Sequence, residues 1–340
     1  MELLKIVNLQ ISYDTPRGIV HAVDDVSFVL KQGENLGLVG ESGCGKTTMG
    51  KSILRILPAN SRILGGQINF QGSNLLTLSN SEMNEIRWKQ ISMISQSAMN
   101  ALNPVYRIGD QLLELLKIRG GLKNNEARDR AFKLFELVGL DRKRFRDFPH
   151  LFSGGMKQRV VIAMALALNP SLIIADEPTT ALDVIIQDQV LRRIYEIQKT
   201  LGKSLILITH DIAIVAERCD KIAVMYAGKL LEFGDIQTVF GAPCSPYTIG
   251  LKNAFPSLTG EKKDLISIPG SPPNLINPSQ GCRFYGRCPF SIDLCFDAEP
   301  ELIRISDSHF AACHRIEEID DLREKGLQKE IWQKGIKKSA

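Results

Sequence analysis

The stretch that decides the fold is Gly40-Glu41-Ser42-Gly43-Cys44-Gly45-Lys46-Thr47, which fits the pattern G-x-x-x-x-G-K-[ST]. It follows an apolar run, Asn35 to Val39, that predicts a buried strand. It precedes a segment, Thr48 to Leu57, that predicts a helix. Strand, loop and helix in this order are the context that the pattern requires, so we expect a phosphate-binding loop here.

The residue types of this loop suit the chemistry. Glycines let backbone N–H groups turn toward phosphate oxygens, and a helix N-terminus adds partial positive charge. We expect Lys46 to reach the β- and γ-phosphates of a nucleotide and the Thr47 hydroxyl to bind Mg²⁺. The alternative is a glycine-rich turn without function, which the strand–loop–helix context disfavours. The predicted cradle comprises Gly40, Ser42, Gly43, Cys44, Gly45, Lys46, Thr47 and Thr48.

A second strand ends in two carboxylates. The run from Leu172 to Ala175 is apolar, and Asp176 and Glu177 follow it. In nucleotide hydrolases with a phosphate loop, an Asp at a strand end holds Mg²⁺, so Asp176 is expected to do so. Glu177 would then orient or deprotonate the attacking water. Taken alone, the pair is weak evidence, because many strands end in solvent-exposed acidic residues. Together with the phosphate loop, it indicates a catalytic role.

The remaining pattern predicts an α/β fold of the P-loop NTPase class. Short apolar runs at 91–94 and 205–209 predict further buried strands, with helical stretches between them, which is typical of a parallel sheet covered by helices. Three helical segments at 107–118, 126–138 and 155–168 interrupt this alternation. They predict a helical subdomain inserted at about 97–168.

The composition, and its change to a proline-rich sequence after about residue 243, predict two domains. Among 340 residues, 44% are hydrophobic and the net charge is only +4, which favours a packed core and argues against nucleic acid as a partner. No apolar run approaches the ~18 residues that span a bilayer, and no signal peptide is recognisable, so a cytoplasmic protein is expected. We predict an ATPase domain at 1–242 and a proline-rich, loop-rich extension at 243–340, whose charged tail from Arg315 forms a surface helix.

Phe152-Ser153-Gly154-Gly155-Met156-Lys157-Gln158-Arg159 resembles the signature of the ABC ATPases. Phe152 stands where that family usually has Leu, and Thr180 where its D-loop has Ser. Over about residues 1–240 the other motifs of the family follow in order. Gln96 resembles the Q-loop, Asp183 in Ala181-Leu182-Asp183 the D-loop, His210 the switch histidine and Tyr13 the aromatic residue that stacks on adenine.

The resemblance implies ATP hydrolysis with Glu177, His210 and Gln96 as catalytic residues, and Mg²⁺ held by Thr47, Gln96 and Asp176. It also implies a head-to-tail pair of ATPase subunits, in which Ser153 and Gly155 contact the nucleotide of the partner and Asp183 lies at the seam. A helix that opens at Ser153 offers a second anion site, which agrees with this arrangement. Taken alone, His210 could be a boundary residue, Gln96 a strand-end residue and Tyr13 a core aromatic residue.

Two further stretches resemble the dipeptide and oligopeptide importer branch of the family. One is 102–111, Leu-Asn-Pro-Val-Tyr-Arg-Ile-Gly-Asp-Gln; the other combines 268–275 with Gly281-Cys282-Arg283-Phe284 and Arg287-Cys288-Pro289. Ser97 and Ala98 depart from the acidic residue and Pro that the branch usually has after the Gln. The resemblance implies a second ATPase chain, identical or different, two transmembrane permease subunits and an external peptide-binding protein. It places the chain on the cytoplasmic face of the plasma membrane.

Four of the seven cysteines gather in the extension with the spacing C-x5-C-x6-C-x17-C: Cys282, Cys288, Cys295 and Cys313. Four thiolates suit Zn²⁺ or an iron–sulfur cluster. Zinc sites usually show tight C-x2-4-C pairs, whereas wider gaps fit the separate corners of a [4Fe–4S] cube, which the importer resemblance also implies. The alternatives are Zn²⁺ or four reduced cysteines that bind nothing. His309 and His314 are weaker candidate ligands.

Three hypotheses for the whole chain remain open at this stage. The first is the ATPase subunit of a peptide importer, or of an importer for another solute such as nickel. The second is a regulatory ABC ATPase that works without membrane subunits. The third is an iron–sulfur sensor that binds nucleotide without hydrolysing it.

Overall fold

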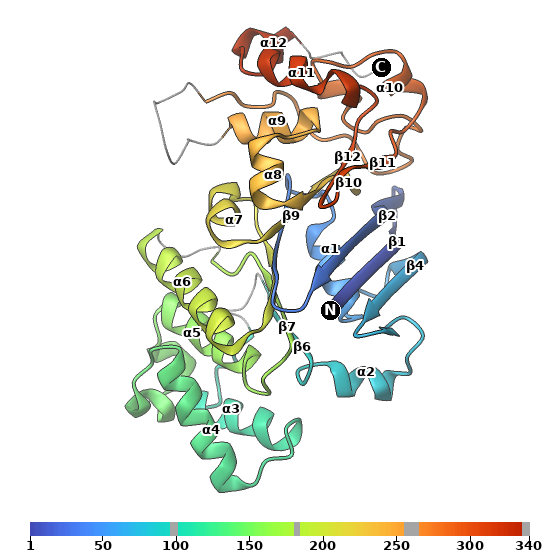
Figure 1. The fold of residues 1–340 in the computed structure, drawn as a ribbon. Coiled ribbons are helices and arrows are strands. Elements are labelled where there is room, and N and C mark those ends of the chain that lie inside the picture. The colour runs from blue at the N-terminus through green and yellow to red at the C-terminus, as the bar shows by residue number, and fades with distance from the viewer. Residues whose placement is uncertain (96–100, 180–183, 255–264, 335–340) are drawn as a thin grey trace. The chain divides into compact units, whose positions relative to one another are not determined.

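The computed structural model describes residues 1–95, 101–179, 184–254 and 265–334 (Figure 1). The chain forms two compact units, each made of segments that are distant in sequence. The first unit contains Met1, Lys31–Glu34 and Thr77–Ile208. The second unit contains Glu2–Leu30, Asn35–Leu76 and Thr209–Ala340. The predicted boundary near residue 242 stays a prediction.

The strands of the first unit are parallel. They are β6 (Ile91–Ile94), β7 (Leu172–Asp176) and β8 (Ser204–Ile208), with β7 paired to both neighbours. Every residue of β7 and β8 is buried. Strands buried on both faces need uninterrupted apolar runs, and for this reason the sequence predicted all three within one residue of their observed ends.

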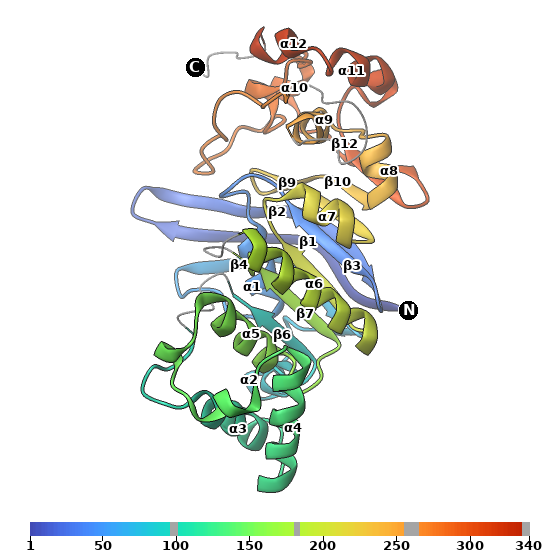
Figure 2. The same cartoon turned by 90° about the vertical axis from the view of Figure 1, so that its left-hand side faces the viewer.

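Several helices belong to the described part of the first unit. They are α2 (Asn80–Ile86), α3 (Ile108–Ile118), α4 (Asn124–Leu137), α5 (Gly154–Ala165), α6 (Val184–Leu201) and the 3₁₀ turns Arg142–Arg146 and Pro149–Leu151. Figure 2 shows α3, α4 and α5 lying together, which confirms the three predicted helices. Helix α3 also packs tightly on the 3₁₀ turn Arg142–Arg146, because a Cβ on Gly109 would lie 2.2 Å from the Phe145 ring. Within the described residues, no helix has both the length and the apolar character needed to cross a membrane.

Two sheets belong to the second unit (Figure 1). One has the order β2-β1-β4-β5, formed by β1 (Glu2–Thr15), β2 (Gly18–Lys31), β4 (Ser61–Phe70) and β5 (Ser73–Asn74). The strands of the other sheet that lie in this unit follow the order β11-β12-β10-β9-β3. They are β3 (Asn35–Val39), β9 (Lys221–Tyr226), β10 (Lys229–Asp235), β11 (Leu302–Ser306) and β12 (His309–Ala312). The β3–β9 pair of this second series is parallel, whereas the β9–β10, β10–β12 and β11–β12 pairs are antiparallel, so the expected parallel sheet continues here with antiparallel strands.

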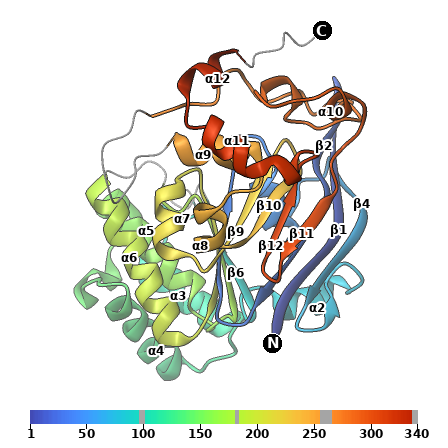
Figure 3. The ribbon, with the colours of Figure 1, turned by 45° about the horizontal axis from the view of Figure 1, so that its top comes forward.

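The extension is built from short elements, as its prolines predict. These are α9 (Pro246–Asn253), α10 (Leu294–Asp297), α11 (Ile319–Lys325), α12 (Lys329–Lys334) and the 3₁₀ turns Tyr285–Arg287 and Ile316–Glu318. Two further helices of the second unit, α7 (Ile212–Arg218) and α8 (Ile236–Gly241), precede the extension in the chain. Figure 3 shows β12 beside β10, so the extension adds strands that the sequence analysis did not predict. The tail is also not a surface helix throughout, because Trp332 is only 1% exposed.

Candidate active site

The glycines of the predicted phosphate loop adopt backbone conformations that other residues avoid. The loop joins β3 to α1 (Lys46–Ile53) in the second unit. Gly40 has φ 146° and Gly45 has φ 103°. A Cβ would lie 2.0 Å from the Met225 carbonyl oxygen at Gly40 and 2.2 Å from the Ala22 carbonyl oxygen at Gly45. Steric exclusion therefore fixes both glycines, and the loop folds close to neighbouring backbone.

Lys46 begins α1 and folds back over the loop. Its ammonium group donates hydrogen bonds to the carbonyl oxygens of Gly40 at 2.8 Å and Glu41 at 2.9 Å. The residue is 6% exposed, so the positive charge is held inside the loop.

Helix α1 starts two residues earlier than predicted and ends at Ile53 in place of Leu57. Arg55 has φ 50°, a left-handed conformation through which a right-handed helix cannot continue, and this accounts for the early end.

Tyr13 and His210, two other predicted site residues, also belong to the second unit. The Tyr13 hydroxyl on β1 hydrogen-bonds with Thr48 Oγ1 at 2.9 Å, and this places Tyr13 at the first turn of α1. The tyrosine is half-buried, so it is not a residue of the closed core. His210 is exposed on the segment before α7. Asp211 caps α7 by accepting a 2.9 Å hydrogen bond from the Ala213 N–H.

The two carboxylates at the end of β7 lie in the first unit and differ in environment. Asp176 is the last residue of the strand and is 1% exposed. Glu177 has φ 44°, and its N–H donates to the Ile208 carbonyl oxygen at 2.9 Å. A non-glycine residue in this region costs about 1–2 kcal/mol, and such strain gathers at functional sites. The left-handed backbone conformation of Glu177 changes the direction of the chain immediately after the buried Asp176.

The predicted signature forms the start of α5 in the first unit. Ser153 is the N-cap, and its hydroxyl accepts a 3.4 Å hydrogen bond from the Met156 N–H. A Cβ on Gly155 would lie 2.5 Å from Ile186 Cγ2, so this position requires glycine. Phe152, which replaces the usual Leu, is 5% exposed and fills a buried position. The remaining predicted residues, Gln96 and Asp183, lie outside the described residues.

The four clustered cysteines line one cavity in the second unit. Cys282 and Cys288 flank a 3₁₀ turn, Cys295 lies on α10 and Cys313 follows β12. The Cys282 N–H donates to the Cys295 carbonyl oxygen at 2.8 Å and ties two of these segments together. Much of the remaining lining is apolar: Leu231, Pro246, Phe284, Phe290, Pro300, Ala312 and Leu322.

Burial controls the acidity of these thiols. It raises the pKa of Cys282 to about 12 and that of Cys313 to about 11, and the neighbouring cysteine sulfurs add to the effect. Burial also raises the pKa of Cys288. Thiols in such a place become thiolates when a cation compensates their charge, which is the chemistry of a metal or metal–sulfur ligand set.

The two candidate histidines have other partners. His309 Nε2 lies 2.7 Å from Glu232 Oε1, and His314 Nε2 lies 2.9 Å from the Ala298 carbonyl oxygen. Glu232 also accepts hydrogen bonds from the N–H groups of Cys244 at 2.7 Å and Ser245 at 2.9 Å. Glu232, Cys244 and His309 bring ligand atoms within 4.8 Å of one another. The carboxylate is, however, already in contact with His309 and accepts two backbone hydrogen bonds, and these contacts join β10, β12 and the start of α9.

The sequence analysis missed the polar residues between the cysteines and the phosphate loop. Arg287 Nη1 donates to Glu41 Oε2 at 2.8 Å, and the Glu41 N–H donates to the Tyr247 hydroxyl at 3.1 Å. The available signal was that Arg283 and Arg287 each adjoin a cysteine in the sequence. Nothing local indicated their partners, because Arg287 and Glu41 are separated by 246 positions.

A glycine-rich loop that joins a buried strand to the first turn of a helix is the phosphate-binding loop of a P-loop nucleotide hydrolase. The family model described as "ABC transporter" matches residues 23–180. A second model, "Oligopeptide/dipeptide transporter, C-terminal region", matches residues 231–295. The chain is also similar, with 28% identity and a TM-score of 0.61 over 69% of its length and 99% of the other chain, to a dimeric ATP-binding cassette bound to ADP and phosphate.

Curated relatives extend the match to nearly the whole chain. The oligopeptide transport ATP-binding protein of Salmonella typhimurium is 44% identical over 93% of this chain and 95% of its own length. The dipeptide transport ATP-binding protein of Bacillus subtilis is 45% identical over 92% of this chain and 94% of its own length. The chain therefore belongs to the ATP-hydrolysing subunits of oligopeptide and dipeptide ABC transporters, and the predicted fold class and family are confirmed.

Proposed function

We propose that the chain binds ATP on the phosphate loop and hydrolyses it to drive uptake of oligopeptides or dipeptides. The observation that carries this proposal is the loop between β3 and α1, where Gly40 and Gly45 are sterically required and Lys46 is held at the helix start. Residues 1–242 would form the motor, and residues 243–340 the importer-specific extension. The names and coverage of the curated relatives support peptides as the solute.

ATP would be held mainly by backbone. Loop N–H groups from Ser42 to Thr48 and the α1 N-terminus suit the phosphate oxygens, and Lys46 adds a charge-assisted hydrogen bond. Tyr13 would stack on adenine from β1. Mg²⁺ prefers oxygen ligands, and Thr47, Gln96 and Asp176 offer a hydroxyl, an amide and a carboxylate oxygen. When bound, Mg²⁺ neutralises charge on the β- and γ-phosphates.

Hydrolysis would depend on Glu177. Its carboxylate accepts a proton from water while the water oxygen forms a bond to the γ-phosphorus and the bond to the bridging oxygen of ADP breaks. His210 and Gln96 would hydrogen-bond the γ-phosphate and the water. The strained backbone of Glu177 supports this assignment, since it fixes the direction in which the side chain leaves the main chain.

The working unit would be a head-to-tail pair of ATPase chains. The similar cassette structure is a dimer bound to ADP and phosphate, which supports the pairing. Ser153 and Gly155, at the start of α5, would contact the nucleotide of the partner, and Asp183 would lie at the seam. We propose a mixed pair, two transmembrane permease subunits and an external peptide-binding protein as the complete importer, with this chain peripheral to the cytoplasmic face of the plasma membrane.

We further propose that Cys282, Cys288, Cys295 and Cys313 hold a [4Fe–4S] cluster, with Zn²⁺ as the alternative. Their convergence on one largely apolar cavity supports a shared ligand over four unrelated thiols. When bound, the cluster would supply a structural cross-link between the 3₁₀ turn, α10 and the segment after β12. Anaerobically purified protein should be brown and absorb near 400 nm; colourless protein that contains zinc would favour the alternative.

The decisive test of the catalytic proposal is Glu177→Gln. We expect ATP hydrolysis to fall by roughly a hundredfold or more while ATP affinity stays within about threefold, because the amide keeps the shape but cannot accept the proton. Glu217→Gln on α7, where the residue is exposed, is the control and should hydrolyse normally. A Glu177→Gln protein with normal turnover would show that another group is the base. Co-purification with membrane subunits separates the importer from a regulatory ATPase.

A further inference from the structure

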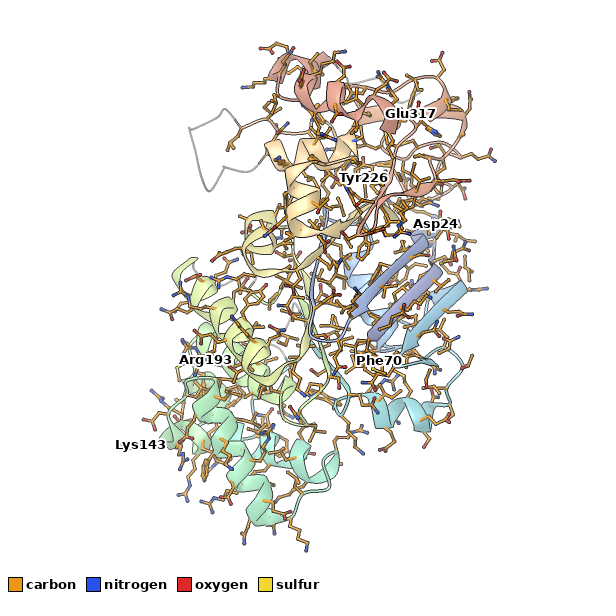
Figure 4. All side chains as sticks on the ribbon, viewed as in Figure 1. Asp24, Phe70, Lys143, Arg193, Tyr226 and Glu317 are labelled. Atoms are coloured by element: carbon orange, nitrogen blue, oxygen red, sulfur yellow. The ribbon has the colours of Figure 1, made fainter. Side chains whose placement is uncertain are left out.

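Arg287 is a buried arginine whose guanidinium is fixed on every side. It is 7% exposed and lies directly before Cys288. Its Nε donates to the Pro269 carbonyl oxygen at 2.8 Å, and its Nη2 to the Ile268 carbonyl oxygen at 3.3 Å. Its Nη1 donates to the Tyr226 hydroxyl at 3.2 Å; Tyr226 is labelled in Figure 4. These contacts hold one edge of the guanidinium toward the phosphate loop.

The acceptor on that edge is the second residue of the phosphate loop. Arg287 Nη1 lies 2.8 Å from Glu41 Oε2, and the Glu41 side chain is 26% exposed. The Glu41 N–H donates to Tyr247 on α9 at 3.1 Å. Both the side chain and the backbone of Glu41 are therefore held by residues from the C-terminal part of the chain, while its carbonyl oxygen accepts a hydrogen bond from Lys46.

A carboxylate in this loop opposes the binding of a triphosphate. Like charges separated by several ångströms repel strongly where burial limits screening, and ATP brings several negative charges. Arg287 compensates Glu41 with a full positive charge that its burial keeps in place. Loss of Arg287 would leave the carboxylate free to repel ATP and to withdraw from its position in the loop.

We propose that Arg287 is a positioning residue for nucleotide binding: by neutralising and anchoring Glu41 it sets the affinity of the phosphate loop for ATP. The proposal rests on ATP binding at this loop. It gives the extension a direct electrostatic role at the nucleotide site, carried by the residue that precedes Cys288.

The test measures ATP dissociation constants of the full chain by titration calorimetry with Mg²⁺ present. Arg287→Met should weaken ATP binding on the order of tenfold. Adding Glu41→Gln to it should restore affinity to within about threefold of wild type, since the uncompensated charge is then gone. Arg287→Lys should fall between wild type and Arg287→Met, because a lysine keeps the charge but not the fixed fork.

Arg283→Met is the matched control. Arg283 is equally buried at 7% exposure and pairs with Asp24 on β2, outside the phosphate loop. Arg283→Met should disturb packing as much as Arg287→Met but leave the ATP dissociation constant within about threefold of wild type. The thermal unfolding temperature of each variant measures the loss of packing. Equal losses in the two arginine variants, or no rescue by Glu41→Gln, would overturn the proposal. Should Lys46→Ala bind ATP normally, the proposed function fails instead, independently of Arg287.

Discussion

The phosphate loop and the four-cysteine pocket both lie in the second unit but are built in opposite ways. The loop is one continuous segment whose backbone makes the site, and its shape depends on glycines such as Gly40 and Gly45. The pocket is made of side chains brought by three separate segments, around the 3₁₀ turn, on α10 and after β12. A backbone site should fail when a Cβ is added, whereas a side-chain site should fail when a sulfur is removed.

Gly45→Ala tests the backbone half of this comparison and should have the largest effect. Its Cβ would lie 2.2 Å from the Ala22 carbonyl oxygen, so the loop must move away from the phosphates. We expect ATP affinity to fall by roughly a hundredfold. Gly33→Ala is the control, because Gly33 has φ 81° but no atom within 4 Å of the added Cβ. It should cost about 1 kcal/mol of stability and leave ATP binding intact.

Cys288→Ser tests the side-chain half. It should reduce bound iron from about four atoms per chain to below about one and abolish the absorbance near 400 nm, since a hydroxyl is a poor substitute ligand. Cys219→Ser, at a buried cysteine beyond α7 that does not line the pocket, should keep both signals. Full iron content in Cys288→Ser, or equal loss in both variants, would argue against the pocket as the ligand set.

The same difference explains what could be predicted from sequence. The phosphate loop, β7 and the N-cap Ser153 are local patterns, and the structure contains each of them where the pattern lies. The β11–β12 hairpin was missed because its strands have only five and four residues and follow a proline-rich stretch. The contact of Arg287 with Glu41 could not be predicted, because the fold alone brings together residues 246 positions apart.

Ser153→Ala should have the smallest effect on the fold. It tests whether the start of α5 contributes to nucleotide binding by the partner chain. Removing the N-cap of α5 should cost about 1 kcal/mol of unfolding free energy. Ser79→Ala removes an equivalent cap, the acceptor of the Glu82 N–H on α2, and should cost a similar amount. Only Ser153→Ala should also weaken ATP-dependent pairing of chains, measured by light scattering in a Glu177→Gln background. Equal pairing in both variants would contradict a role for Ser153 at the partner's nucleotide.

The most direct test of the account is a titration of ATP into Lys46→Ala, whose wild-type ammonium group is held inside the phosphate loop. Removing this charge while keeping the backbone cradle should weaken ATP binding by roughly a hundredfold without changing the unfolding temperature by more than a few degrees. A Lys46→Ala protein that is folded and binds ATP with wild-type affinity would mean that nucleotide does not bind at this loop.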